Sequence, residues 1–254
     1  MQADLQIAAQ QNAVRALGYD LHQPCYIIAE NRIDKLGSPK LVILPSPQAL
    51  RESTWQSLLT YVRNGGNLLV TGPVSRDEHW HLVDRYTPLG IKATTEPLTF
   101  HDARITGSVG LSSQVEITFL SFNQQDQQLL EYLHFEDGAA IKDFPLGHGQ
   151  LFWCAYPVEL SDSSHSAAAL YRQVVERASI PPSWDGGILF GDALLINPIN
   201  LQDAVLYVFE NESDQEDNMN LRDPVTGAQF AVRVPAGRAA LALIDKKTKQ
   251  IVAK

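Results

Sequence analysis

Residues 40–71 decide the fold, because two apolar runs flank a helical stripe there. The runs are Lys40-Leu41-Val42-Ile43-Leu44-Pro45 and Asn67-Leu68-Leu69-Val70-Thr71, and continuous apolar runs are typical of strands covered on both faces of a parallel sheet. Ser53 is expected to cap the helix between them, and Asn64-Gly65-Gly66 to end it; its apolar stripe is Trp55, Leu58, Leu59 and Val62. Strand, helix and strand with short connections predict a βαβ unit, and hence an α/β domain with a parallel sheet.

Upstream of this unit the sequence predicts one helix and one short strand. Helical spacing relates Leu5, Ala9, Ala13, Ala16 and Leu17, and Gly18 is expected to end the helix. Residues 26–28, Tyr-Ile-Ile, predict a strand. A doubly wound sheet normally opens with a strand before its first helix. Either residues 3–8 form that strand, or it lies in sequence preceding this chain, and we favour the second alternative.

Downstream, the pattern changes to alternation. Residues 114–119 and 129–133 predict antiparallel strands beside the sheet. After a Gly-His-Gly turn at 147–149, residues 150–156 predict a further strand, and residues 163–178 predict a closing helix.

A second domain is predicted after the double proline. Pro181-Pro182 removes two backbone donors and forces the preceding residue out of the helical region, so we divide the chain into residues 1–181 and 182–254. Trp184 is expected in a core, with a domain or subunit contact as the alternative. The second part predicts a small β-sandwich, with an acidic solvated loop at 210–217 and strands at 193–196, 204–210, 228–234, 238–244 and 250–253.

Composition limits the partners. The 254 residues carry 20 basic and 29 acidic side chains, a net charge of -9, without any basic run, which argues against nucleic acid. No window approaches the roughly 20 apolar residues of a membrane helix. Residues 1–9 lack the basic and apolar parts of a signal peptide, which favours the cytoplasm. Cys25 and Cys154 lie in apolar runs and are expected as buried thiols, with a bridge between them as the lesser alternative.

Two motifs in order carry a family resemblance. They are Tyr61-Val-Arg-Asn-Gly-Gly-Asn-Leu-Leu-Val70 and, later, Gly147-His-Gly-Gln-Leu-Phe-Trp153 with Tyr156-Pro-Val-Glu159. With residues 40–47 they make the first part resemble the class I glutamine amidotransferase-like domain that follows the catalytic barrel in β-galactosidases of glycoside hydrolase family forty-two. The resemblance implies a flavodoxin-like, doubly wound sheet with added antiparallel strands, followed by a small β domain.

The resemblance implies a domain without catalysis. An amidotransferase carries its cysteine at an elbow after the second of these strands, where this chain has Gly72. The histidine that precedes a proline in that family corresponds to Tyr156, a phenol that cannot act as a base near neutral pH. Glu159 alone matches. Glycosidase carboxylates of the family lie on a barrel of about 250 residues, and this chain has no such pattern.

The sharpest polar cluster is Arg76-Asp77-Glu78-His79-Trp80-His81, at the carboxyl end of the 67–71 run. Open α/β sheets place their ligand crevices at such ends, so a sugar site is one interpretation. The favoured alternative is a capped loop in which Arg76 pairs with Asp77 and Trp80 covers the sheet edge. A metal held by His79 and His81 together with Asp77 is the weakest interpretation, since the spacing marks no further ligand.

Together these features predict a non-catalytic C-terminal region of a bacterial glycoside hydrolase, serving as a scaffold or oligomerisation domain. Its expected partners are the catalytic barrel of the same enzyme, a second copy of the chain and a carbohydrate, and neither cofactor nor metal is expected. The alternative function is a self-standing carbohydrate-binding or hydrolase module that uses the 76–81 loop. A purely structural role between domains is the third.

Overall fold

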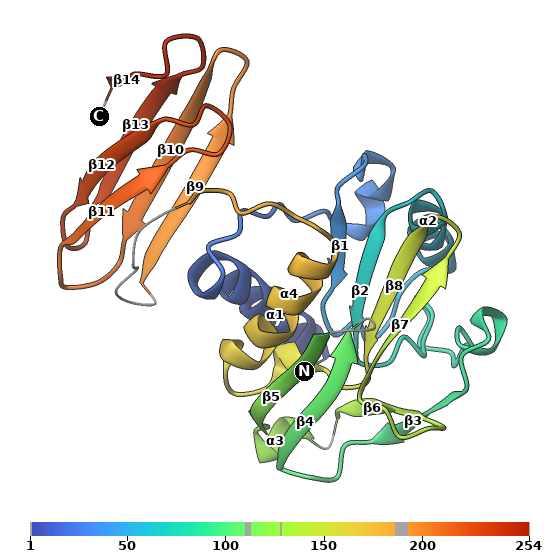
Figure 1. Cartoon of the computed structure of the whole chain (residues 1–254). Helices are drawn as coiled ribbons and strands as arrows, with labels where there is room; N and C mark the ends of the chain where they lie inside the picture. The colour runs from blue at the N-terminus through green and yellow to red at the C-terminus, as the bar shows by residue number, and fades with distance from the viewer. Residues whose placement is uncertain (1, 110–112, 128, 186–192, 254) are drawn as a thin grey trace. The chain divides into compact units, whose positions relative to one another are not determined.

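The computed structural model describes residues 2–109, 113–127, 129–185 and 193–253. It divides into two compact units, one of Met1–Val14 with Ile27–Ile180 and one of Arg15–Tyr26 with Pro181–Lys254 (Figure 1). The second unit therefore takes in twelve residues near the start of the chain, 15–26, that no sequence signal assigns to it. None of the described helices is long and apolar enough to cross a membrane.

The first unit is built on a four-stranded sheet. Its strand order is β1 (Leu41–Leu44), β2 (Asn67–Thr71), β8 (Gly149–Cys154) and β7 (Ile141–Leu146). β1, β2 and β8 run parallel, and β7 runs antiparallel to β8. Helix α2 (Glu52–Arg63) connects β1 to β2, which confirms the predicted βαβ unit.

The apolar stripe of α2 packs on one face of this sheet. Its buried side chains share a core with Leu68, Val70, Leu151 and Trp153. The predicted cap is wrong: the helix begins at Glu52, and Arg51 precedes it without a capping side chain. Arg51 has an extended backbone, and its N–H donates to Glu30 Oε1 at 2.7 Å. The residue before the helix is therefore held by a side chain from outside the helix.

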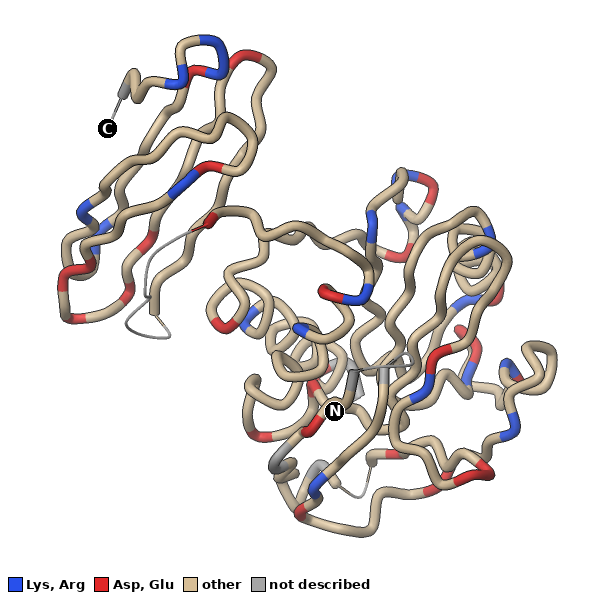
Figure 2. The backbone as a smooth tube through the Cα atoms, in the orientation of Figure 1, with Lys and Arg blue, Asp and Glu red and all other residues tan. Residues whose placement is uncertain are grey.

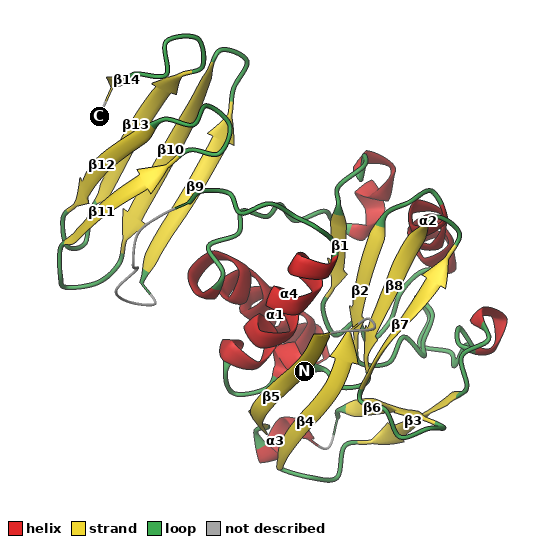
Figure 3. Cartoon of the chain, viewed as in Figure 1, coloured by secondary structure: helices red, strands yellow, loops and turns green. Residues whose placement is uncertain are grey.

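Two further long helices belong to the first unit (Figure 3). α1 (Gln2–Arg15) confirms the predicted first helix. It continues into a π-helical turn, Ala16–Asp20, whose residues are assigned to the second unit; Gly18 lies within this turn, so the expectation that it ends the helix is wrong. Residues 3–8 are therefore helical, so the strand alternative for them is wrong. α4 (Ser164–Arg177) follows a short 3₁₀ turn, Val158–Leu160, and Ser163 caps α4 by accepting the N–H of His165.

The predicted alternating segments are antiparallel strands, but they form two separate ladders and do not extend the main sheet in the described residues. β3 (Ala93–Pro97) pairs with β6 (Glu131–Phe135), and β4 (Asp102–Val109) pairs with β5 (Ser113–Ser121). The remaining short elements of this unit are the 3₁₀ turns Glu30–Lys35 and Thr87–Leu89 and the helix α3 (Gln124–Gln127).

The strand predicted at residues 26–28 is wrong. These residues are loop, and Tyr26 and Ile27 expose 63% and 66% of their surface. Strand preference depends on a neighbouring strand to pair with, and three residues offer too little ladder without one. Cys25 is likewise exposed, against expectation, whereas Cys154 is buried in β8; both are free thiols.

The second unit contains two antiparallel sheets around one core. β14 (Ile251–Ala253), β13 (Ala239–Asp245), β10 (Ala204–Asn211) and β9 (Leu194–Asn200) form one sheet in that order, and β11 (Asp217–Arg222) pairs with β12 (Gln229–Val234) in the other. Side chains of both sheets bury one another, including Tyr207, Phe209, Met219 and Phe230. Trp184 packs partly buried against this core.

The acidic stretch predicted as a loop is only partly one. β10 runs to Asn211 and β11 starts at Asp217, so residues 212–216 connect two strands. β11 was not predicted, because its two buried side chains, Met219 and Leu221, alternate with polar residues.

A buried hydrogen bond also lies in the second unit: the Tyr207 hydroxyl donates to the buried carboxylate of Asp223 at 2.7 Å.

The two glycine motifs of the sequence meet in space. A Cβ atom on Gly149 would lie 2.1 Å from the carbonyl oxygen of Gly66 and 2.2 Å from that of Val62. Gly147 has φ +63°, and a Cβ there would lie 2.6 Å from the carbonyl oxygen of Arg63. The start of β8 therefore lies directly on the backbone that ends α2, at a distance that only glycine allows.

We therefore expect Gly149→Ala to destabilise the first unit by about 3 kcal/mol, because the methyl group would clash with backbone that cannot move aside. Gly90→Ala is the matched control: its φ is +71° and nothing lies within 4 Å of the added Cβ, so only the left-handed backbone costs, about 1–2 kcal/mol. Urea unfolding of the full chain measures both. Equal losses in the two variants would contradict the contact.

Candidate functional site

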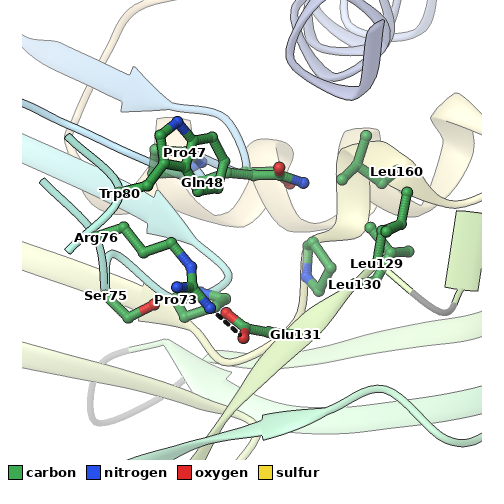
Figure 4. Close-up of a pocket in the computed structure, with 12 residues that line it drawn as sticks. Pro47, Gln48, Pro73, Ser75, Arg76, Trp80, Leu129, Leu130, Glu131 and Leu160 are labelled. Carbon is green, nitrogen blue, oxygen red and sulfur yellow. Dashed lines mark hydrogen bonds and ion pairs between the residues drawn. The ribbon is translucent and has the colours of Figure 1, made fainter. Parts of the chain in front are cut away.

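The candidate site lies at the carboxyl edge of the parallel strands. Three segments leave the sheet there: Pro45 onward after β1, Gly72 onward after β2, and Ala155 onward after β8. A small pocket opens between them (Figure 4). It is lined by residues of these segments and of the β6 approach: Ser46, Pro47, Gln48, Pro73, Ser75, Arg76, Trp80, Leu129, Leu130, Glu131, Pro157 and Leu160.

Beneath this edge, Glu159 is completely buried and held by hydroxyl groups. Its Oε2 accepts hydrogen bonds from Ser46 Oγ at 2.5 Å and Thr71 Oγ1 at 2.6 Å, and its Oε1 accepts one from Tyr171 Oη at 2.5 Å. Burial raises the pKa of Glu159, and the three hydroxyl donors oppose that rise without cancelling it. The carboxyl group thereby links the ends of β1 and β2 to α4, and we call this set of bonds the junction.

Gly72, at the position of the expected elbow, has a left-handed backbone, and a side chain there would be in close contact with Pro157. Its φ is +70°, and a Cβ atom there would lie 3.3–3.5 Å from three atoms of Pro157. Its N–H donates to Cys154 O at 2.9 Å, and its carbonyl accepts Trp153 Nε1–H at 2.9 Å. The backbone groups at this turn are therefore used within the fold.

Tyr156 belongs to an aromatic cluster. Its ring stacks on Tyr132 with centroids 5.3 Å apart and an interplanar angle of 2°, and Phe100 meets it edge-on at 5.8 Å. Burial raises the pKa of the Tyr156 phenol. The neighbouring Tyr132 has its pKa raised to about 12, chiefly by its hydrogen bond to Glu96. Both groups therefore remain neutral phenols near pH 7.

The 76–81 loop is capped, as favoured from sequence, but by different pairs. Asp77 Oδ1 accepts the N–H groups of His79 and His81 at 2.8 and 2.9 Å. Partial desolvation would raise the pKa of Asp77, but these donors outweigh it and lower the pKa. The expected pair of Arg76 with Asp77 is wrong: Arg76 Nη2 binds Glu131 Oε1 at 2.9 Å, and Asp77 Oδ1 instead accepts the two loop N–H groups.

The metal interpretation finds no set of ligands. His79 and His81 have ring centroids 6.1 Å apart, and among the described residues no three His, Cys, Asp or Glu side chains gather where an ion could bind. Glu78 is exposed and does not line the pocket. Of the predicted loop residues, only Arg76 and Trp80 line it.

The sequence did not identify the hydrogen-bonding partners of Glu159 or the ion-pair partner of Arg76. Ser46 and Thr71 could have been found, since each lies at the end of a predicted parallel strand beside the expected position of Glu159. Tyr171 and Glu131 carry no comparable signal, because the sequence does not show which face of α4 or which end of β6 meets the sheet edge.

No protein-family model matches the sequence, and no curated protein matches it. Solved structures do share its fold. The β-galactosidase of Bacillus circulans sp. alkalophilus matches with a TM-score of 0.66 and 13% identity over 94% of this chain and 37% of that one. The cold-adapted β-galactosidase of Rahnella sp. R3 gives 0.63 and 16% over 92% and 36%. The α-L-fucosidase isoenzyme 2 of Paenibacillus thiaminolyticus gives 0.56 and 11% over 94% and 45%.

At these identities the likeness shows the fold. The chain spans a little over a third of the length of the two β-galactosidases and less than half that of the fucosidase. In each case the match covers more than nine tenths of this chain. The chain thus has the fold of a region found within larger glycosidases.

Proposed function

We propose that this chain is a non-catalytic region of a larger glycoside hydrolase, β-galactosidase-like, with a scaffold or oligomerisation role. The observation that carries the proposal is the burial of Glu159: its carboxyl group is fully buried among three hydroxyl groups, and Pro157 is in close contact with position 72. An active site needs a reactive group that a substrate can reach. Here the one matching carboxyl group is sealed from solvent.

The finer assignment is an amidotransferase-like, doubly wound domain at residues 1–181 followed by a β-sandwich domain at 182–254. Its support is the parallel order β1-β2-β8 with α2 on one face, and the bond from Tyr171 of α4 to Glu159, which also binds the end of β2. The β-galactosidases with this fold have nearly two thirds of their length outside the match. We propose that the main partner of this chain is a catalytic barrel, which would correspond to that unmatched part.

The chain should accordingly neither release ammonia from glutamine nor hydrolyse chromogenic galactosides, glucosides or fucosides. Position 72, the expected elbow, carries glycine and hence no nucleophile, and Glu159, the carboxyl group that matches the amidotransferase pattern, is buried. Both assays are run on the full chain against a buffer blank. Turnover that disappears in Asp77→Asn or Glu159→Gln would contradict the non-catalytic proposal and favour a hydrolase.

Replacing Glu159 should change stability. Glu159→Ala removes the acceptor of three buried hydroxyl groups and leaves a cavity, and we expect a loss of about 3 kcal/mol or more. Exposed Glu78→Ala is the control and should change little. A catalytic carboxylate would show the reverse pattern, with stability kept or raised on its removal.

The pH dependence follows from the raised pKa of Glu159. Because the folded state holds this proton more tightly than the unfolded state, the group favours folding below its ordinary pKa, and this contribution is lost as pH rises from there through the folded pKa. Glu159→Gln carries no titrating proton, so its stability relative to the wild type should improve across that window. Urea midpoints from pH 4 to 8 measure the difference, and parallel curves would refute the assignment.

A scaffold that works by self-association predicts a defined oligomer. We expect light scattering to give a multiple of the 28.1 kDa chain mass at concentrations of about 10–100 µM, where stable interfaces are populated. A monomer across that range would remove self-association and leave the barrel of the same enzyme as the partner.

A further inference from the structure

Trp80 presents an aromatic surface at the mouth of the pocket. It exposes 40% of its surface, whereas Trp55 and Trp153 expose 2% and 0%. The Arg76 guanidinium lies 5.9 Å from the ring centroid, which holds the ring in place by a cation–π contact. Figure 4 shows Trp80 beside Pro47 and Gln48, with Leu129 and Leu160 farther along the pocket. An exposed indole next to a lined depression is a surface that a flat apolar ligand face can cover.

The polar part of the pocket is electrically balanced. Arg76 and Glu131 form an ion pair at 2.9 Å, with 27% and 32% of their side chains exposed, so both can still reach a ligand. Gln48 adds an amide with donors and an acceptor. Because the charge of Arg76 is already met by Glu131, the pocket has no spare cation for an anionic ligand. Acidic positions outnumber basic ones along the chain (Figure 2), which further disfavours anions.

We propose that this pocket is a subsite for one ring of a neutral saccharide. A pyranose has an apolar C–H face, which would stack on Trp80, and hydroxyl groups on its edge, which both donate and accept. The hydroxyl groups of the ring would donate to Glu131 and accept from Arg76 and Gln48. The planar end groups of these side chains can each form hydrogen bonds with two neighbouring hydroxyl groups. The subsite is independent of the scaffold proposal, because it requires neither an oligomer nor a barrel.

The size of the pocket sets the binding mode. Its cavity volume is about 60 Å³, well below the roughly 300–1,000 Å³ of pockets that enclose a small-molecule ligand. The ring therefore lies at the mouth on Trp80 and only an edge enters. Such partial burial gives weak affinity, with a Kd of about 1–10 mM.

The test is a titration of the full chain with methyl β-galactoside and methyl β-glucoside, followed by NMR of the four tryptophan indole N–H groups. At least one sugar should shift the Trp80 signal saturably while the Trp55 and Trp153 signals stay fixed. Trp80→Ala should weaken binding, measured by saturation transfer to the sugar, at least about tenfold, and Trp80→Phe, which keeps a ring, by less than about threefold. Gln48→Ala should weaken it about two- to fivefold.

Matched controls distinguish the subsite from a nonspecific effect of sugar and from unfolding. Trp184→Phe, in the second unit, should leave sugar binding unchanged, and unchanged Trp55 and Trp153 signals in Trp80→Ala show that the fold is kept. Galacturonate, which adds a carboxylate to the galactose ring, should bind more weakly than methyl β-galactoside. The proposal is overturned by the absence of a saturable shift up to about 100 mM sugar, by equal binding in Trp80→Ala, or by tighter binding of galacturonate.

Discussion

The buried carboxyl group of Glu159 is the interaction on which the first unit depends. Burying a carboxyl group without a cation is costly unless its oxygens are hydrogen-bonded. Ser46 after β1, Thr71 at the end of β2 and Tyr171 in α4 supply those bonds, and Asn12 of α1 donates to the Glu159 backbone carbonyl at 2.7 Å. One residue thereby fixes the carboxyl ends of the strands against two helices. Each partner lost would leave another buried polar group unsatisfied, so the junction stabilises the fold as a whole.

This junction also keeps the Glu159 carboxyl group out of reach of solvent. Glu159 can hold the strand ends only from inside, and the 3₁₀ turn that carries it brings Pro157 against Gly72. The same turn that carries the buried carboxyl group therefore also brings Pro157 into contact with position 72. At the rim of the pocket, by contrast, Trp80 is exposed and Gln48 lines the depression beside it.

The parts of the fold that the sequence predicts are those with local causes. The βαβ unit follows from two continuous apolar runs, the helical stripe between them and the glycines that end the helix. Helix α4 follows from the helical pattern of residues 163–178. The two glycine motifs, some eighty residues apart, could be recognised separately. Their contact could not, because a missing Cβ marks that something lies close and does not say what. It is the fold that brings Gly149 onto the backbone of Gly66.

The failures have other causes: a missing pairing partner, a weak strand composition or a partner distant in the sequence. Residues 26–28 have strand composition but no partner, and β11 has weak composition yet pairs fully with β12. Arg76 forms its ion pair with Glu131, 55 residues along the chain, and not with its sequence neighbour Asp77. Asp77 Oδ1 accepts N–H groups of its own loop. The contacts of side chains at the rim thus depend on which segments meet there, whereas the side chains beneath the rim are held by their bonds to Glu159. A fold can therefore persist at 13% identity while its rim is free to take a binding role that the core forbids.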